Sequence, residues 1–223
     1  MQFLDAASLL DSGPLQFPRR IERLLWHLGF SDVSNIDGSG DEGGDILAFH
    51  KGETWVVQCK WKRRGAVGAD AVNEVARARD HYRAHKAVVV TNTRFSPDAR
   101  QRVANLARLG PGILLWGGTD LTTSFDRVPP RFGRVTPRPY QAEALQALTA
   151  DLDASGRALL VLATGLGKTI VGGEVIAAHL RRVPQDQVLV VAHAKDLVQQ
   201  LERALWRHLP KDVPTRLLTG DTR

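Results

Sequence analysis

A proline-rich break near the middle of the chain limits this sequence to two separately folded units. Residues 122–137 contain three prolines and show no apolar periodicity, whereas the segments on both sides do. Such a stretch cannot continue a helix or a strand, and its prolines make it a semi-rigid linker. We therefore expect one unit over residues 1–121 and a second over residues 138–223.

The first unit alternates short apolar runs with amphipathic segments. Two apolar runs separated by His50-Lys51-Gly52-Glu53 are typical of a β-hairpin. Ser96-Pro97-Asp98 is a helix start, with a capping hydroxyl, a proline at the first helical position and an early acidic residue. The alternation predicts an α/β layer. The expected elements are helices over residues 19–28, 68–84 and 96–109 and strands over residues 46–49, 54–61, 87–91 and 113–116.

Three polar residues stand out on the hairpin. Period-two alternation places Gln58 and Lys60 on one face of their strand and Cys59 on the other, with the aromatic residues. Asp45 opens the preceding strand, so Gln58 and Lys60 point towards it. The Asp45 carboxylate, the Gln58 side-chain carbonyl and the Cys59 backbone carbonyl are oxygen ligands that Mg²⁺ accepts. Lys60 would orient the attacking water and offset charge in the transition state.

The spacing alone leaves two interpretations open. Acidic glycine-rich turns before a strand are common, and a lysine near a strand end is usually a solvated charge. Two details favour a metal-dependent nuclease site. Gln58 and Lys60 interrupt a strand that is otherwise apolar, and the basic residues Lys62, Arg63 and Arg64 follow at once, as candidates for DNA contact.

An ordered set of motifs runs through the first 120 residues. Its segments are Leu28-Gly29-Phe30, Gly40-Asp41-Glu42-Gly43-Gly44-Asp45, Val57-Gln58-Cys59-Lys60-Trp61, Val88-Val89-Val90-Thr91-Asn92, Phe95-Ser96-Pro97-Asp98-Ala99 and Leu114-Leu115-Trp116-Gly117. Taken together, these motifs resemble the Mrr-like restriction endonuclease domain. The resemblance implies a nuclease core of the PD-(D/E)xK type, with Asp45 and Lys60 catalytic and Gln58 in the place of the second acidic residue.

One departure from that family concerns the first helix. The family often carries a glutamate directly after a phenylalanine there, whereas Phe17 is followed by Pro18 in this chain. Glu22 lies one helical turn later and could project on the same face, because residues four apart are neighbours. The alternative for Glu22 is a surface charge on an amphipathic helix.

The second unit contains a phosphate-binding loop. The apolar strand expected over residues 158–162 leads into Thr164-Gly165-Leu166-Gly167-Lys168-Thr169, and a helix over residues 170–180 follows. In this setting the glycines let backbone N–H groups approach phosphates, Lys168 meets the terminal phosphates of ATP and Thr169 ligates Mg²⁺. Leu162 stands where the longer consensus has its first glycine.

The same segment is similar to the start of the superfamily-two helicase core, found in DEAD/DEAH-type and restriction-enzyme motors, so we expect a truncated RecA-like domain. The resemblance implies that Gln141, after Tyr140, contacts adenine. It also implies that the strand over residues 188–192, with His193 and Lys195 after it, touches the nucleic-acid backbone. Ala194 departs from the arginine that is common there, and taken singly His193 and Lys195 are more often structural or solvated.

The length of the second unit bears on its activity. Only 54 residues follow Thr169 (223 minus 169), and none of them forms an Asp-Glu pair that would position the hydrolytic water. They hold one more amphipathic helix, from Leu197 to Leu209, and one further expected strand over residues 215–219. We expect a fragment of a longer protein that holds ATP but does not hydrolyse it alone.

Composition limits the kinds of partner to expect. The net charge of +6 favours a polyanion such as nucleic acid as the partner. The sequence has no long apolar run of the kind that would indicate a membrane. The single cysteine, Cys59, excludes an internal disulfide, and the N-terminus is not a signal peptide, so we expect a cytoplasmic protein. The expected partners are DNA and either further copies of the chain or other restriction-system subunits.

Two functions from different classes fit these observations. The first is a Mg²⁺-dependent DNA endonuclease coupled to an ATP-dependent helicase, in DNA restriction or phage defence. The second is a catalytically weak nuclease-fold module that binds modified or damaged DNA and recruits the motor, as in a repair helicase. Pro18, in the place of the acidic residue, is the feature that favours the second.

Overall fold

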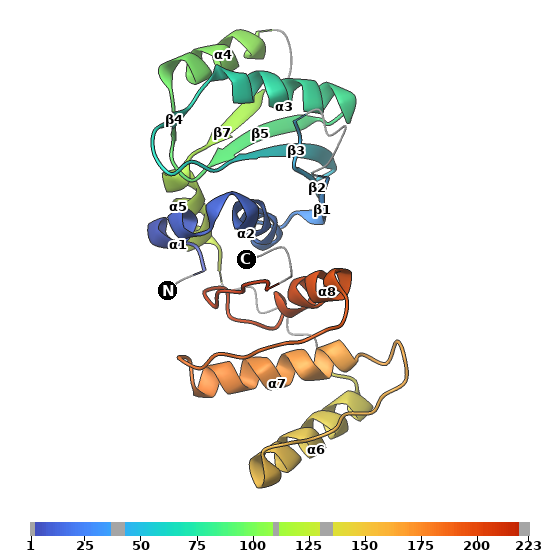
Figure 1. Ribbon diagram of the computed structural model, residues 1–223. Coiled ribbons are helices and arrows are strands. Elements are labelled where there is room, and N and C mark those ends of the chain that lie inside the picture. The colour runs from blue at the N-terminus through green and yellow to red at the C-terminus, as the bar shows by residue number, and fades with distance from the viewer. Residues whose placement is uncertain (1–2, 37–42, 109–111, 130–135, 219–223) are drawn as a thin grey trace. The chain divides into compact units, whose positions relative to one another are not determined.

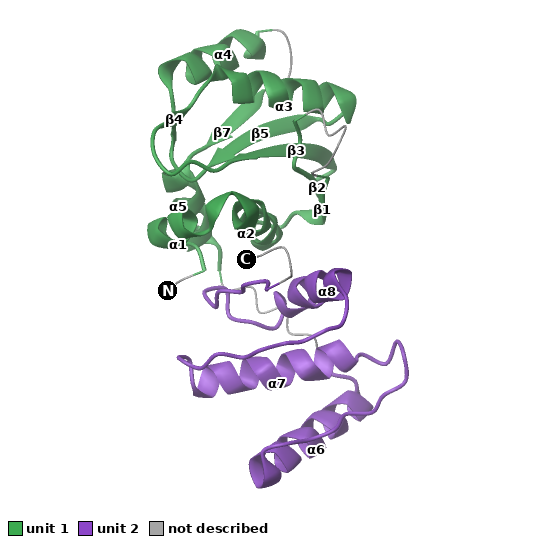
Figure 2. Cartoon of the chain, viewed as in Figure 1, with its two compact units in different colours: residues 1–129 green, residues 130–223 purple. Residues whose placement is uncertain are grey.

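The chain forms two compact units, residues 1–129 and residues 130–223 (Figure 2). The computed structural model describes residues 3–36, 43–108, 112–129 and 136–218. Asp41 and Glu42, which belong to the acidic turn before Asp45, lie outside the described residues, as does Thr219 at the end of the last expected strand.

A five-stranded sheet forms the centre of the first unit (Figure 1). The first three strands in its order pair antiparallel, and the last three pair parallel. A separate parallel pair joins β4 (Ala66–Val67) to β6 (Arg94–Phe95). The order of the sheet is β1 (Ser31–Asn35), β2 (Ile46–His50), β3 (Glu53–Lys60), β5 (Lys86–Thr91) and β7 (Ile113–Trp116).

Helices cover both faces of this sheet, which confirms the expected α/β layer (Figure 1). One core lies between the sheet and three helices, α1 (Ala6–Asp11), α2 (Gly13–His27) and α5 (Gly118–Arg127). The other core lies under α3 (Ala69–His81) and α4 (Pro97–Ala107). A strand covered on both faces carries a continuous apolar run, as residues 87–90 of β5 do.

The side chains of β3 alternate between these two cores as its sequence predicts. Trp55 and Val57 pack in the core under α2, whereas Val56 packs in the core under α3. Gln58 and Lys60 share the parity of Val56, so they face α3. The capped start of α4 is also confirmed, because the Ser96 hydroxyl accepts a hydrogen bond from the Ala99 N–H at 3.4 Å.

The linker does not begin at residue 122 as expected. Helix α5 continues to Arg127, and its Phe125 is buried in the first core beside Phe3, with ring centroids 5.4 Å apart. The apolar residues of this helix, Leu121 and Phe125, lie four apart, which is too short a run to register as periodicity among threonines and prolines. The helical turns therefore belong to the first unit.

Helix α2 also differs from its expected bounds. It begins at Gly13 rather than Arg19, and Pro18 lies inside it. A proline removes one backbone donor and usually ends a helix. Here the turns before and after Pro18 bury Phe17 and Ile21 in the core, and that burial offsets the lost hydrogen bond.

The second unit contains three helices in its described part, α6 (Pro139–Ser155), α7 (Lys168–Arg182) and α8 (Lys195–Leu205). Its small apolar core joins α7 to α8 and the segment after it, through Leu180, Leu205 and Leu209. Throughout the described ranges, no helix is long and apolar enough to cross a membrane.

The strands expected in the second unit do not form in the described residues. Residues 158–162, 188–192 and 215–218 make no sheet. Leu159 and Val161 are 86% and 79% exposed, so the apolar pattern is present but nothing packs on it. A strand is stabilised by hydrogen bonds and side-chain pairs with a neighbouring strand, which an alternating sequence cannot supply by itself.

Candidate active site

Asp45 is held in place immediately before β2 begins. Its backbone N–H donates to the carbonyl of Val57 at 2.9 Å, so the residue is tied to β3 one step before β2. Its carboxylate oxygen Oδ2 accepts a hydrogen bond from the backbone N–H of Cys59, with an N···O distance of 2.5 Å. The carboxylate is thereby held against the peptide that joins Gln58 to Cys59.

Gln58 is buried, and its side-chain carbonyl has no hydrogen-bond partner among the described residues. The residue is 4% exposed, and its Oε1 receives no hydrogen bond from the part of the chain that the structure describes. A buried acceptor without a hydrogen bond costs about 1–3 kcal/mol. Such atoms are rare in folded proteins and call for an explanation, for example an unseen water or ion. Gln58 Oε1 therefore marks a place where a bound group would supply a missing contact.

Lys60 reaches from the end of β3 to helix α3. Its ammonium lies 2.5 Å from Oε2 of Glu74, and the two side chains are 33% and 31% exposed. Glu74 was not among the residues that the sequence singled out. It lies between Val72 and Val75, which pack into the core under α3, and spacing within a helix does not reveal a partner on a distant strand. No sequence signal available in a single chain would have found it.

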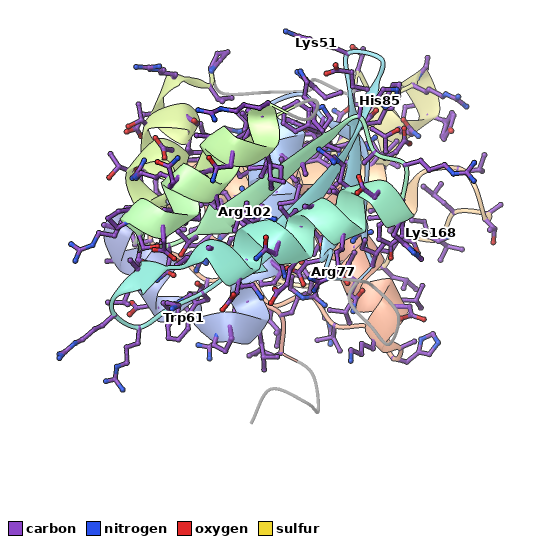
Figure 3. The ribbon with its side chains drawn as sticks, turned by 90° about the horizontal axis from the view of Figure 1, so that it is seen from above. Lys51, Trp61, Arg77, His85, Arg102 and Lys168 are labelled. Carbon is purple, nitrogen blue, oxygen red and sulfur yellow. The ribbon has the colours of Figure 1, made fainter. Side chains whose placement is uncertain are left out.

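These residues gather at one end of β3. The β2–β3 hairpin, with Lys51 at its turn, lies at the opposite end of the strand from Trp61 (Figure 3). The structure thus brings Asp45, Gln58 and Lys60 together where β3 ends, and adds Glu74 to them.

Glu22 approaches from the other layer of the unit. It lies on α2 and is 3% exposed, so the alternative of a surface charge is wrong. Its Oε1 accepts a 3.5 Å hydrogen bond from Nδ2 of Asn35, which pairs with Ile46 across β1 and β2. Gln58 and Lys60 face the opposite side of the sheet, towards α3. A catalytic role for Glu22 remains a prediction.

The basic residues after β3 lie on an anchored loop. The side chain of Asn92 accepts from the Lys62 N–H and donates to the Lys62 carbonyl, both at 2.8 Å. The Lys62 ammonium donates to the carbonyl of Ala66 at 2.9 Å. Arg63 and Arg64 are exposed beside this clamp. The loop therefore presents two exposed arginine side chains next to the end of β3.

The phosphate-binding loop has the backbone that its glycines predict. Gly165 and Gly167 adopt positive φ angles of 82° and 85°, in the left-handed region that favours glycine. Gly167 is the N-cap of α7, so the N-terminus of this helix opens onto the loop. The exposed ammonium of Lys168 donates to the carbonyls of Leu162 and Ala163, at 2.7 and 3.3 Å.

Gln141 packs against that loop. Its Nε2 donates to the Leu166 carbonyl at 3.0 Å, and its Oε1 accepts from the Arg138 N–H at 2.9 Å. A Cβ on Gly167 would lie 2.5 Å from the same Nε2, and the φ of 85° at this residue also favours glycine. Gln141 therefore supports the loop, and its expected contact with adenine stays a prediction.

The other residues expected at the nucleotide or at nucleic acid lie in the same unit. Thr164 is exposed and Thr169 is half-buried in the first turn of α7. His193 is exposed, and Lys195 is the first residue of α8. Their roles in binding remain predictions.

Metal-ligand clusters of the simplest kind are absent from the described ranges. Residues 3–36, 43–108, 112–129 and 136–218 contain no group of three or more His, Cys, Asp or Glu side chains placed to hold a metal ion. The donors at the end of β3 are mixed, a carboxylate from Asp45 and an amide oxygen from Gln58.

Comparison with known proteins gives two family matches. The model of the restriction endonuclease family with the Mrr-type catalytic domain matches residues 9–125, and that of the type III restriction enzyme res subunit matches residues 134–223. A search of curated proteins finds no match. A crystal structure of a protein of unknown function, AF1548, is 19% identical, with 83% of this chain and 94% of that chain covered and a TM-score of 0.40.

The two matches confirm the resemblances drawn from the motifs, including the order of a nuclease domain followed by a helicase-type P-loop region. The first match alone covers more than half of the chain. The protein therefore belongs to the restriction endonuclease family with the Mrr-type catalytic domain, and carries a helicase-type segment after that domain.

Proposed function

We propose that the first unit is a Mg²⁺-dependent DNA endonuclease, coupled to an ATP-binding helicase segment in DNA restriction or phage defence. The observation that carries the proposal is the buried Oε1 of Gln58, which has no hydrogen-bond partner among the described residues. Gln58 directly precedes Cys59, whose N–H holds the Asp45 carboxylate, and it shares a strand face with Lys60. Membership of a restriction endonuclease family supports the same reaction.

The residues at the end of β3 fit a divalent cation. Mg²⁺ prefers a few protein oxygens together with water and phosphate oxygens. Asp45 offers a carboxylate and Gln58 offers an amide oxygen that lacks a partner. We assign these two residues, with the backbone of Cys59, as the group that would hold the ion. When bound, the ion would polarise the phosphate as a Lewis acid.

Asp45 and Lys60 carry the protein's own part of the reaction. The Cys59 N–H orients the Asp45 carboxylate, which fixes where positive charge is favoured. The Lys60 ammonium brings positive charge and three hydrogen-bond donors to the same strand end. There it offsets the negative charge that builds on the phosphate and orients the attacking water.

Arg63 and Arg64 supply the contact with DNA in this proposal. They are exposed beside the site on a loop that Asn92 holds in place. Guanidinium groups bind phosphate oxygens and position a duplex without reading its sequence.

A nicking assay on supercoiled plasmid tests the proposed function. We expect the full chain to convert modified or unmodified plasmid to nicked or linear DNA in Mg²⁺, and EDTA to stop it, because two protein oxygens without a cation do not activate water. Ca²⁺ in place of Mg²⁺ controls for general effects of a divalent ion. Cleavage that continues in EDTA would contradict the assigned metal site.

The second unit binds ATP through residues 164–169 in this proposal. In the structure, the Lys168 ammonium donates to two loop carbonyls, and we propose that it exchanges them for phosphate oxygens when ATP binds. Thr169, the next residue, would contact the Mg²⁺ that accompanies ATP.

Replacing Lys168 with alanine should weaken ATP binding by roughly 10- to 100-fold, because a hydrogen bond to a charged group contributes about 1.5–3 kcal/mol. Titration of a fluorescent ATP analogue, followed by anisotropy, measures the change. Lys195→Ala removes another exposed lysine of the same unit outside the loop, and should leave the affinity unchanged. Equal affinity of Lys168→Ala and the unaltered chain would exclude this loop as the ATP site.

A second candidate function is binding without cleavage. The observation that favours it is Pro18 inside α2, where the family often has a glutamate. In that case the first unit would recognise modified or damaged DNA and recruit the motor for repair. DNA binding that is independent of Mg²⁺, without nicks in any plasmid tested, is the result that this alternative predicts.

A further inference from the structure

Glu74 makes a contact at this site that the sequence analysis did not predict. It lies in the middle of α3, and its Oε2 is 2.5 Å from the Lys60 ammonium. An ion pair between side chains that are one-third exposed adds little to stability, because water screens it and both chains lose freedom. The pair therefore matters for where it holds the Lys60 ammonium, and much less for the stability of the fold.

The turn before Asp45 packs closely against Glu74 and Gln58. A Cβ added to Gly43 would be 2.9 Å from Cβ of Glu74 and 3.5 Å from Oε1 of Gln58. Gly43 also has a φ of 89°, a backbone angle that residues with a side chain rarely adopt. A glycine is thus needed for the turn, α3 and β3 to meet, and Glu74 and the Oε1 atom of Gln58 both lie close to this one glycine.

The negative charge of Glu74 affects where the Lys60 ammonium lies. A divalent cation held by Asp45 and Gln58 would repel the ammonium of Lys60, which is on the same strand end. A lysine side chain is flexible and would turn towards solvent under that repulsion. The carboxylate of Glu74 attracts the ammonium, and so would keep it at the site.

We propose that Glu74 is a positioning residue for Lys60, which holds the lysine ammonium at the nuclease site beside Gln58. The inference rests on the proposed endonuclease function, and it assigns Glu74 no direct contact with the cation or with DNA.

The inference predicts that Glu74→Ala lowers the kcat of plasmid cleavage by about 10- to 100-fold with little change in KM, because a misplaced catalytic group costs up to about 100-fold. The kcat of Glu74→Gln should lie between that of the unaltered chain and that of Glu74→Ala. The glutamine amide oxygen still accepts a hydrogen bond from the Lys60 ammonium, but it carries no charge. Glu53→Ala is the matched control. It removes an ion pair of similar exposure, to Lys86, from the other end of β3, and should leave cleavage unchanged.

A double substitution separates positioning from an independent role. If Glu74 acts only through Lys60, the Lys60→Ala, Glu74→Ala pair should cleave no more slowly than Lys60→Ala alone. A further loss in the double variant would overturn the inference.

Two measurements do not depend on cleavage. In the metal-free chain, ¹⁵N NMR of lysine ammonium groups should show a Lys60 signal slowed in exchange, which Lys60→Arg identifies and which Glu74→Gln removes. In the Lys60→Ala background, Glu74→Gln should leave Mn²⁺ affinity unchanged by calorimetry. A loss of about tenfold or more there would make Glu74 a metal ligand and overturn the positioning role.

These outcomes distinguish the two proposals. If the unaltered chain cuts no DNA while the Lys60 signal behaves as expected, the endonuclease proposal fails and the contact stands. If the chain cuts DNA and Glu74→Ala cuts equally fast, the positioning role fails and the endonuclease stands.

Discussion

Replacing Lys60 with alanine is expected to slow DNA cleavage by roughly 10²- to 10³-fold, the loss typical when one preorganised donor to a developing negative charge is removed. The reason is the position of its ammonium at the end of β3, on the face that Gln58 shares and within 2.5 Å of Glu74. Plasmid nicking in Mg²⁺, measured under single-turnover conditions, reports this loss.

The affinity for DNA should change little in the same variant. Arg63 and Arg64 stay exposed on the loop that Asn92 clamps, and phosphate contacts of this kind dominate binding to a duplex. Anisotropy of a labelled duplex in Ca²⁺ measures binding apart from cleavage. Cleavage at the original rate would remove Lys60 from the mechanism, and a parallel loss of binding would make it a DNA contact instead.

Lys86→Ala is the matched control for this experiment. Lys86 pairs with Glu53 at 2.9 Å, and its side chain is 39% exposed against 33% for Lys60. Both variants lose one positive charge and one partly exposed ion pair, which contributes about 1 kcal/mol or less to stability. Lys86→Ala also removes a cation–π contact with Trp55, at 5.2 Å, so this control should be no more stable than the Lys60 variant. Only the Lys60 variant should lose cleavage.

The core of this site could be predicted because it depends on local rules. Period-two alternation along residues 53–60 is a property of any strand, and it places Gln58 and Lys60 on the same face. The hairpin then fixes the register, so that Ile46 pairs with Val57 and Asp45 comes next to them. Three residues within sixteen positions were enough to locate the strand end.

Contacts between distant segments could not be predicted in the same way. Glu74 on α3 pairs with Lys60 on β3, so the contact joins a helix to the sheet beneath it. The sequence of the helix indicates only which of its residues enter the core. The burial of Glu22, which lies on α2, was missed for a similar reason, because a charged residue on an amphipathic helix is usually exposed.

Segments with a weak apolar pattern were missed as well. Strand β1 has the sequence Ser-Asp-Val-Ser-Asn and is mostly exposed at the sheet edge, so alternation gives no signal there. In the second unit the opposite happened. Residues 158–162 and 188–192 have the pattern of strands, but in the described residues they pair with no neighbour. Pattern specifies which face would be buried, and pairing decides whether a strand exists.

The clamp on the basic loop depends on a close backbone approach elsewhere in the first unit. The N–H of Gly118, at the start of α5, donates to the Thr93 carbonyl at 2.8 Å. A Cβ on Gly118 would lie 2.4 Å from the backbone oxygen of Asn92 and 3.0 Å from its carbonyl carbon. These are backbone atoms, which cannot rotate away, and the side chain of Asn92 holds both polar groups of Lys62.

Gly118→Ala should therefore destabilise the first unit by about 1–3 kcal/mol, the usual cost of forcing extra volume into a packed site. Hydrogen exchange of the β5 amides in increasing urea, measured by mass spectrometry, reports the stability of the first unit alone. Tryptophan fluorescence would mix the two units, because Trp206 lies in the second. Gly112→Ala is the control, since a Cβ there meets no atom within 4 Å. If the two alanine variants protect β5 equally well, residues 92 and 93 yield to the added methyl group, and the backbone approach at Gly118 does not hold the loop beside the candidate site.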